Sequence, residues 1–132
     1  MALPLRATLA LLGAAALVAG CGEPDPVADR DGVLRLTLDE YTITPQNLKV
    51  RAGRIKLVVR NEGRLAHDVA IESDVEGEGT QPRIYGRTDV ARPGERVRER
   101  GTIRLAPGRY RLSCTLGNHD NLGQFGTLEV TR

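Results

Sequence analysis

The sequence predicts an all-β domain, and three observations support that prediction. Apolar residues recur with a period of two along most of the chain after residue 32. No stretch shows the 3.6-residue period of an amphipathic helix, and glycine- or proline-containing turn signals separate the apolar runs. These turn signals are Ala52-Gly53, Asn61-Glu62-Gly63, Arg92-Pro93-Gly94 and Ala106-Pro107-Gly108. Seven or eight short strands in about 100 residues favour an antiparallel sandwich or barrel.

The alternation can be followed along the chain, and it marks the expected core. The apolar positions are, in order, Leu34, Leu36 and Leu38; Ile55, Leu57 and Val59; Val69 and Ile71; Val97, Ile103 and Leu105; Tyr110, Leu112 and Cys114; and Leu128 and Val130. The run through Ile103 carries a second series on its other side, Arg96, Arg98, Arg100 and Arg104. We interpret this basic run as a solvated face, and contact with an acidic partner or anionic lipid is the alternative.

The first 20 residues are predicted to be an export signal. Arg6 is their only charge, an apolar stretch follows from Thr8 to Val18, and small residues lead up to Cys21. Such a short apolar run is typical of a signal and not of a membrane-spanning helix. The pattern resembles the bacterial lipoprotein signal, which implies that Cys21 becomes a lipidated N-terminus on the outer face of the cytoplasmic membrane or on a periplasmic membrane face. The alternative is an ordinary signal with Cys21 incidental.

The remainder divides into a linker, residues 21–32, and one folded domain, residues 33–132. Proline and acidic residues dominate the linker, as in flexible tethers. About 100 residues suffice for one domain with one core. Removing Arg6 with the signal leaves 18 basic side chains against 17 acidic ones, a balance that argues against nucleic-acid binding.

Few side chains of the predicted domain could bind a metal ion or act as a nucleophile. If Cys21 carries lipid, Cys114 is the only free thiol, and the chain has two histidines, His67 and His119. Exported proteins usually pair their cysteines, so a single free thiol needs a reason. Two imidazoles and one thiolate are the in-plane ligands of a blue-copper centre. A buried inert cysteine with two structural histidines is the first alternative, and zinc completed by Asp120 is the second.

The C-terminal pattern is more specific than the residue count. Cys114 is followed by a glycine-containing loop to His119, a second short loop to Gln124, and a strand with the sequence Gly-Thr-Leu-Glu-Val at 126–130. This arrangement, with Pro-Gly-Arg-Tyr at 107–110 before the cysteine, resembles the copper loop of cupredoxins. The resemblance implies a Greek-key β-sandwich that binds one copper ion through His67, Cys114 and His119 and transfers single electrons.

The resemblance also implies roles for neighbouring residues. The spacing from His119 to Gln124 is similar to that of stellacyanin, which implies an axial glutamine ligand, and the alternative is that Gln124 only lines the pocket. Asp68 stands where relatives tie the two ligand loops together by hydrogen bonds, and the alternative is a solvated residue. Three leucines are candidates for an apolar docking patch around the exposed histidine, or alternatively fold inwards to seal the metal: Leu65, Leu116 and Leu122.

The sequence therefore predicts a monomeric, membrane-tethered copper protein that exchanges electrons with redox partner proteins. The alternative is a copper-handling lipoprotein for scavenging or delivery, but such proteins tend to expose methionines and several histidines. Enzyme activity is not expected, because a second copper centre would need further histidines and nothing indicates an oxyanion hole beside Cys114.

Overall fold

The computed structural model describes residues 25–75 and 81–132, which form eleven strands and no helix. The strands are β1 (Val27–Ala28), β2 (Val33–Asp39), β3 (Thr42–Thr44), β4 (Asn47–Arg51), β5 (Gly53–Asn61), β6 (Ala70–Ser73), β7 (Ile84–Arg87), β8 (Arg96–Arg98), β9 (Ile103–Leu105), β10 (Gly108–Ser113) and β11 (Phe125–Thr131). Within these ranges no helix is therefore long and apolar enough to cross a membrane. The predicted signal and Cys21 lie outside the described residues.

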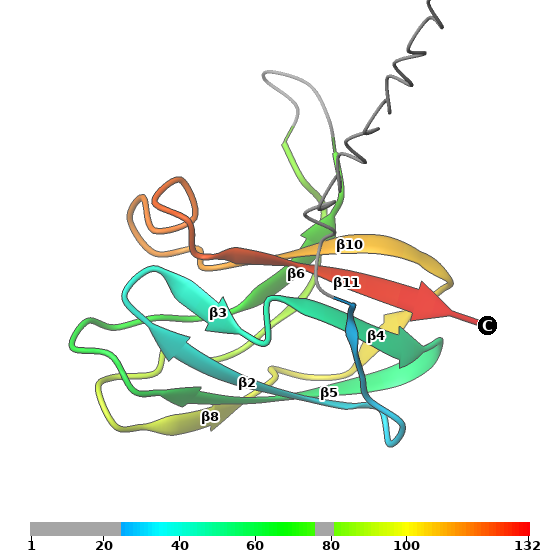
Figure 1. Cartoon of the computed structure of the whole chain (residues 1–132), viewed down its shortest axis with the longest axis horizontal. Helices are drawn as coiled ribbons and strands as arrows, with labels where there is room; N and C mark the ends of the chain where they lie inside the picture. Colours follow the sequence, from blue (N-terminus) through cyan, green and yellow to red (C-terminus); the bar gives the residue numbers. More distant parts are fainter. Residues whose placement is uncertain (1–24, 76–80) are drawn as a thin grey trace, which may run out of the picture.

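The strands form two sheets that pack face to face (Figure 1). Sheet A has the order β1-β4-β11-β10-β6-β7, and sheet B has the order β3-β2-β5-β8 with β9 also paired to β5. This confirms the all-β sandwich. There are more strands than the seven or eight expected because several pairing segments are very short. The arginine-rich run 96–105, for example, is interrupted after Arg98, so that β8 and β9 pair with opposite ends of β5.

The sheets are mixed, where a purely antiparallel arrangement was expected. β2 runs parallel to β5, and β4 runs parallel to β11. The reason is that β4 and β5 are consecutive in sequence but belong to different sheets, with the chain crossing between them at Ala52. Each of these strands therefore lies beside a strand that is distant in sequence, and its direction follows from the crossover and not from a hairpin turn.

The core lies between the sheets and is built by the alternation seen in the sequence. In β2 and β5 every second side chain is buried, and the side chains between them are exposed or half-buried. The buried apolar residues of sheet B include Leu34, Leu36, Leu38, Ile55, Leu57 and Val59, and those of sheet A include Leu48, Val50, Ile71, Leu112, Leu128 and Val130. Because removing this apolar surface from water is the main favourable term in folding, these rows hold the two sheets together.

The folded part of the chain begins earlier than expected. Residues 21–32 were predicted to be a flexible linker, but Val27 and Ala28 form a strand at the edge of sheet A, parallel to β4. The Asp29 backbone amide also donates a hydrogen bond to the Lys49 carbonyl at 2.8 Å, and Asp31 forms an ion pair with Arg35 at 2.9 Å. Backbone pairing attaches this segment to sheet A, and the carboxylates of Asp29 and Asp31 attach it to Arg35 of sheet B.

Three of the loops at the end of the sandwich opposite the C-terminus concern the predicted site (Figure 1). They are the turn between β2 and β3, the loop between β5 and β6, and the loop between β10 and β11. The last two carry the three residues that the sequence singled out, His67, Cys114 and His119. The strands thus act as a rigid frame that fixes the starting points of these loops.

Candidate metal centre

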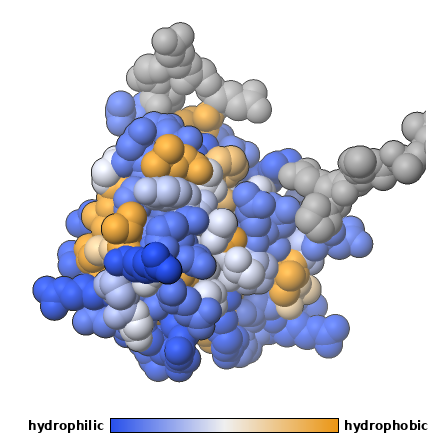
Figure 2. Space-filling model, turned by 60° about the vertical axis from the view of Figure 1, so that its left-hand side comes forward, coloured by the Kyte–Doolittle hydropathy of each residue, from blue (hydrophilic) through white to orange (hydrophobic). Residues whose placement is uncertain are grey.

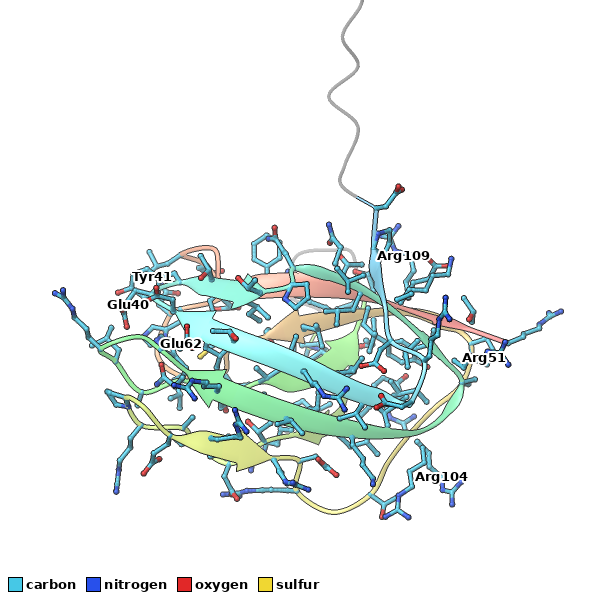
Figure 3. The ribbon with its side chains drawn as sticks, turned by 60° about the horizontal axis from the view of Figure 1, so that its bottom comes forward. Glu40, Tyr41, Arg51, Glu62, Arg104 and Arg109 are labelled. Atoms are coloured by element: carbon cyan, nitrogen blue, oxygen red, sulfur yellow. The ribbon has the colours of Figure 1, made fainter. Side chains whose placement is uncertain are left out.

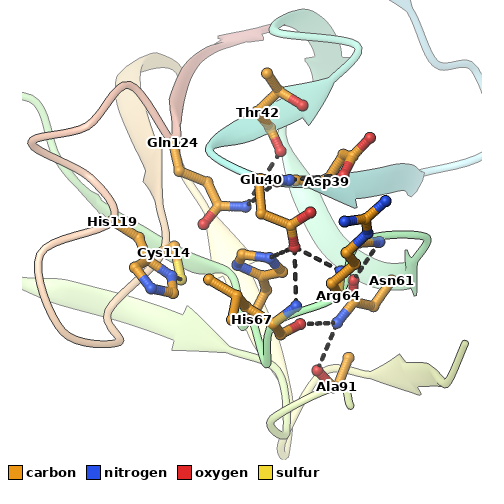
Figure 4. Close-up of polar contacts among 12 residues, drawn as sticks. Asp39, Glu40, Thr42, Asn61, Arg64, His67, Ala91, Cys114, His119 and Gln124 are labelled. Atoms are coloured by element: carbon orange, nitrogen blue, oxygen red, sulfur yellow. Dashed lines mark hydrogen bonds and ion pairs between the residues drawn. The ribbon is translucent and has the colours of Figure 1, made fainter. Parts of the chain in front are cut away.

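The two histidines and the free cysteine converge at this end of the sandwich (Figure 4). One ligand atom from each of His67, Cys114 and His119 lies within 4.8 Å of the other two. The Cys114 Sγ atom is 3.6 Å from His119 Nδ1, and the two imidazole ring centroids are 5.0 Å apart. His67 and Cys114 are buried, while His119 is half-buried. The three donors are arranged to bind one metal ion.

The loop between Cys114 and Gln124 is closed by its own backbone. The Cys114 amide donates to the Gln124 carbonyl at 3.1 Å, and the Gln124 amide donates to the His119 carbonyl at 3.0 Å. Gly117 and Gly123 have φ angles of +55° and +114°. Only glycine adopts such conformations readily, so these two residues allow the tight reversals that return His119 towards the thiol.

Gln124 is completely buried, and its orientation is set by its hydrogen bonds. Its amide nitrogen donates to the backbone carbonyls of Asp39, at 2.9 Å, and Thr42, at 3.2 Å. Because carbonyl oxygens only accept, the nitrogen must occupy this side and the oxygen the other. The Oε1 atom has no hydrogen-bond partner among the described residues and points towards the three donors (Figure 4).

Glu40 orients His67, and the sequence analysis did not identify it. Glu40 Oε1 accepts hydrogen bonds from the backbone amides of Arg64, at 2.6 Å, and Leu65, at 2.8 Å, and lies 3.3 Å from His67 Nε2. The backbone amides, foremost that of Leu65, lower the pKa of Glu40 to about 2, so its carboxylate is charged at neutral pH. A neutral His67 that donates from Nε2 keeps its lone pair on Nδ1, which is buried without a partner in the described structure.

Asn61 braces the loop that carries His67. Its side-chain nitrogen donates to the carbonyls of Leu65, at 2.7 Å, and Ala91, at 2.9 Å, and its oxygen accepts from the Gly63 amide at 2.9 Å. The backbone of His67 pairs with Ala91 in both directions, at 3.0 and 2.8 Å. The Asn-Glu-Gly sequence correctly predicted a turn, but not that the asparagine is buried at its centre.

Asp68 joins the two ligand loops. It is buried, and its carboxylate accepts hydrogen bonds from the Thr115 amide at 2.7 Å and the Thr115 hydroxyl at 2.5 Å. Since Thr115 follows Cys114 and Asp68 follows His67, this contact fixes one ligand loop against the other. The alternative of a solvated strand-edge residue does not fit this position.

Burial also affects the thiol itself. Removal from water raises the pKa of Cys114 above its ordinary value, because the interior disfavours the charged thiolate. A thiol in this position therefore stays protonated at neutral pH until a cation replaces its proton. Binding of a metal ion here should release a proton and weaken as the pH falls.

The end of the molecule around His119 is partly apolar. Leu65 and Leu122 are 42% and 55% exposed, whereas Leu116 is half-buried. Figure 2, in which this end comes forward, shows apolar side chains interrupting a largely polar surface. Tyr41 packs edge-on against His119, with ring centroids 5.2 Å apart, from a turn where its own φ is +56°. Sequence reasoning missed Tyr41, since nothing in the local pattern marks it.

Asp120, which was considered as a fourth ligand for zinc, is not part of the donor cluster. Its carboxylate lies 4.0 Å from the Arg111 guanidinium instead. The additional polar atom that faces the cluster is the oxygen of Gln124.

Comparison with known proteins identifies the fold. No protein-family model matches the chain, and no curated protein matches it. Reduced auracyanin from Roseiflexus castenholzii superposes with a TM-score of 0.66 at 19% identity, covering 79% of this chain and 100% of that one. Auracyanin A from Chloroflexus aurantiacus, described as a "blue" copper protein, gives 0.60 at 18% identity, covering 76% and 100%. Reduced rusticyanin gives 0.55 at 15% identity, covering 86% and 89%. The chain therefore has the cupredoxin fold.

Proposed function

We propose that this protein is a type 1 copper protein that transfers single electrons. The observation that carries the proposal is the convergence of one buried thiol and two imidazoles, with ligand atoms within 4.8 Å of one another, in a cupredoxin fold. A thiolate with two imidazoles and a weak axial donor is the donor set of blue-copper electron-transfer sites. Auracyanin A, a copper protein, shares the fold and gives the proposal independent support.

The residues present fit a copper ion. His67 Nδ1 and Gln124 Oε1 are both buried, and neither has a hydrogen-bond partner in residues 25–75 and 81–132. An unsatisfied buried polar atom is unfavourable, so two such atoms that face the same thiol fit a cation-binding site. His67, Cys114 and His119 would hold the ion, and Gln124 Oε1 is a further oxygen donor that faces the same three residues.

Copper, when bound, would supply the one-electron change between Cu(II) and Cu(I). The chain's own task is to keep the ligand geometry nearly constant through that change. Asn61, Glu40 and Asp68 fix the loop of His67 through hydrogen bonds, and Gly117 and Gly123 set the loop of His119. The burial of Cys114 and His67 excludes water from the site. His119 is the ligand nearest to solvent, so its ring edge is the expected path for electrons.

The copper-handling alternative finds no support in this geometry. Delivery requires an ion that leaves readily, whereas two of the three donors are buried and held by backbone hydrogen bonds. Leu65 and Leu122 beside His119 fit a surface that forms brief contacts with a redox partner. We therefore propose electron transfer in preference to copper delivery.

The proposed location is outside the cytoplasm. The predicted signal and lipidated Cys21 would tether a monomeric domain to the outer face of the cytoplasmic membrane or to a periplasmic membrane face. Mass spectrometry of the protein purified from a bacterial host tests this directly, since the mature chain should begin at Cys21 and carry acyl chains. A chain that begins elsewhere without lipid would contradict the anchor and leave the copper site unaffected.

The visible spectrum of the purified protein tests the copper proposal. Titration with Cu(II) should produce an intense thiolate-to-copper absorption that saturates at one equivalent. Cys114→Ser should fold normally by circular dichroism but stay colourless, and Ser113→Ala, next to the ligand, is the matched control that should stay coloured. A folded protein with an intact thiol and no absorption would reject the type 1 centre.

A further inference from the structure

The outer face of sheet B carries a group of basic side chains that the copper site does not use. In β5 the exposed residues alternate with the buried Ile55, Leu57 and Val59. The cross-strand registers place residues of β8 and β9 on the same side. The group, called the basic face below, consists of Arg54, Lys56, Arg60, Arg96, Arg98 and Arg104. All of its members are exposed, and Arg104 extends outwards at its edge (Figure 3).

The basic face places like charges directly opposite one another. Arg54 pairs in register with Arg104, and Arg60 pairs with Arg96. Like charges at opposed positions of neighbouring strands destabilise a sheet. Among the described residues, only Arg60 of this group forms an ion pair, with Glu62 at 3.0 Å. The nearby Glu99 carboxylate is engaged elsewhere, because it accepts a hydrogen bond from the Leu57 amide at 2.9 Å.

Two basic side chains of sheet A, in contrast, form ion pairs with acidic residues. Lys49 on β4 pairs with Glu129 on β11 at 3.1 Å, and Arg109 on β10 pairs with Asp74 at 3.6 Å. Lys49 and Arg109 are thus neutralised, whereas Arg54, Lys56, Arg96, Arg98 and Arg104 of the basic face form no ion pair among the described residues. Uncompensated arginines at opposed positions point to a role outside the folded domain.

A hollow of about 210 Å³ marks the end of the basic face nearest the metal centre. Its lining includes Arg60 and Arg96, with Arg35, Thr37 and Val58 beside them. Arg35 is itself paired with Asp31, whereas the Arg96 guanidinium is free in the described structure. The planar guanidinium fork of arginine suits carboxylates, which it can bind through two parallel hydrogen bonds.

The basic face also adjoins the loop of a proposed copper ligand. Arg60 immediately precedes Asn61, which braces the loop of His67, and Arg96 follows Glu95, whose carbonyl accepts the Asn61 amide at 2.9 Å. A protein resting on this face would reach the same end of the sandwich as Leu65. Asp25, the first described residue, lines a hollow of sheet A together with Arg109 and Glu129, away from the basic face.

We propose that the basic face is a docking surface for a carboxylate-rich protein, namely the partner that exchanges electrons with the copper site. The identity of the partner as a redox protein rests on the proposed electron-transfer function. The binding of an acidic protein to the basic face does not depend on that function. Complementary charge would orient the two proteins and speed their encounter, while the apolar end around His119 would form the contact through which the electron passes.

The test uses an oligoglutamate peptide as the acidic probe and amide chemical shifts as the readout, at low ionic strength. We expect shifts in β5, β8 and β9 and in the loop before His67, with binding that weakens as salt is added. The double substitution K56E/R98E should weaken binding at least tenfold. The control R51E/R87E makes the same change in net charge at exposed residues outside the basic face and should change binding less than twofold. Circular dichroism would verify that both variants fold.

Three results would overturn the proposal. Equal weakening in both double variants would show a response to net charge alone. Shifts confined to other surfaces would place acidic binding elsewhere. Binding to phosphatidylglycerol vesicles that depends on Lys56 and Arg98, without binding of the peptide, would assign the face to a lipid surface. The titration does not require copper, so its failure is distinguishable from a negative copper spectrum, which would remove the electron-transfer role and leave the peptide result standing.

Discussion

Glu40 Oε1 lies 3.3 Å from His67 Nε2 and at the same time accepts two backbone amides from the loop that precedes that histidine. All three hydrogen bonds end on one oxygen atom. A single carboxylate thus fixes the loop, the ring orientation and the tautomer of a proposed copper ligand. Outer-shell carboxylates of this kind increase the donor strength of a metal-bound imidazole.

The charge of Glu40 should lower the reduction potential of the copper site. A negative group behind the His67 ring favours the more highly charged Cu(II) state over Cu(I). In Glu40→Gln, an amide oxygen in the same place accepts the same three hydrogen bonds without the charge. We expect the potential to rise by on the order of 40 mV, less than the roughly 59 mV that corresponds to a tenfold change in a one-electron couple. Protein-film voltammetry gives the value.

Glu62→Gln is the matched control, because Glu62 is an exposed carboxylate near the same loop that pairs with Arg60 instead of a ligand. Its potential should stay close to that of the unmodified protein. A Glu40→Gln variant whose potential also stays unchanged would mean that the carboxylate holds the loop without affecting the metal.

Glu40 should also make the stability of the folded domain depend on pH. Its pKa is lowered to about 2 from an ordinary value of 4.5, mainly by the backbone hydrogen bonds of the loop. A carboxylate with a lowered pKa stabilises the folded state at pH values above its ordinary pKa of 4.5. This stabilisation is lost as the pH falls from 4.5 towards 2. We expect the free energy of unfolding of the metal-free protein to fall over this interval, and to fall less in Glu40→Gln. Urea unfolding at a series of pH values measures this, and identical slopes in both proteins would contradict it.

Asn61 should be among the most sensitive positions outside the ligands. Asn61→Ala removes three hydrogen bonds and leaves the Leu65 carbonyl and the buried Gly63 amide without this partner, while the Ala91 carbonyl keeps only the bond from the His67 amide. We expect a loss of about 2–4 kcal/mol in the free energy of unfolding, since each unsatisfied buried group costs about 1–3 kcal/mol. Chemical denaturation measures the loss. Asn121→Ala, at an exposed asparagine of the ligand loop, should change stability by less than about 0.5 kcal/mol.

The features that depend on short stretches of sequence were predicted correctly. The period-two alternation of β2 and β5 records which side chains face the core, so the all-β class and most inward positions were predictable. The convergence of His67, Cys114 and His119 was inferred from their spacing and resemblance, and the structure places them together. The Cys114–Gln124 loop is short enough for its sequence to define it almost completely.

The missed features depend on contacts between distant segments. Glu40 and Tyr41 belong to the turn after β2. They reach the metal centre only because the fold brings that turn beside residues that are at least 24 positions away in the sequence. The pairing of Val27 with Leu48 is another such contact, and the composition of that segment indicated a tether. The basic face shows a related limit. Its alternating arginines were visible in the run 96–105, but the opposed arginines of β5 became apparent only from strand register.

Substitutions of Gln124 can show whether its side chain binds the metal or only packs beside it. Gln124 Oε1 is the polar atom left free when the amide nitrogen donates to Asp39 and Thr42. If it binds copper, Gln124→Met replaces a hard oxygen with a soft thioether and favours Cu(I). The reduction potential of this variant should rise by at least about 60 mV, which corresponds to about 1.4 kcal/mol for a one-electron couple. Gln124→Leu loses the same hydrogen bonds as the methionine variant but offers no donor, and therefore controls for changes in packing.

Both variants should lower stability to a similar degree, because each leaves the carbonyls of Asp39 and Thr42 without their donor. The difference between their spectra then reports on the axial contact alone. We expect distinct copper hyperfine splittings in the electron paramagnetic resonance spectra of the unmodified, methionine and leucine proteins. Identical potentials and spectra for all three would show that Gln124 lines the site and holds the β2–β3 turn in place without touching the metal.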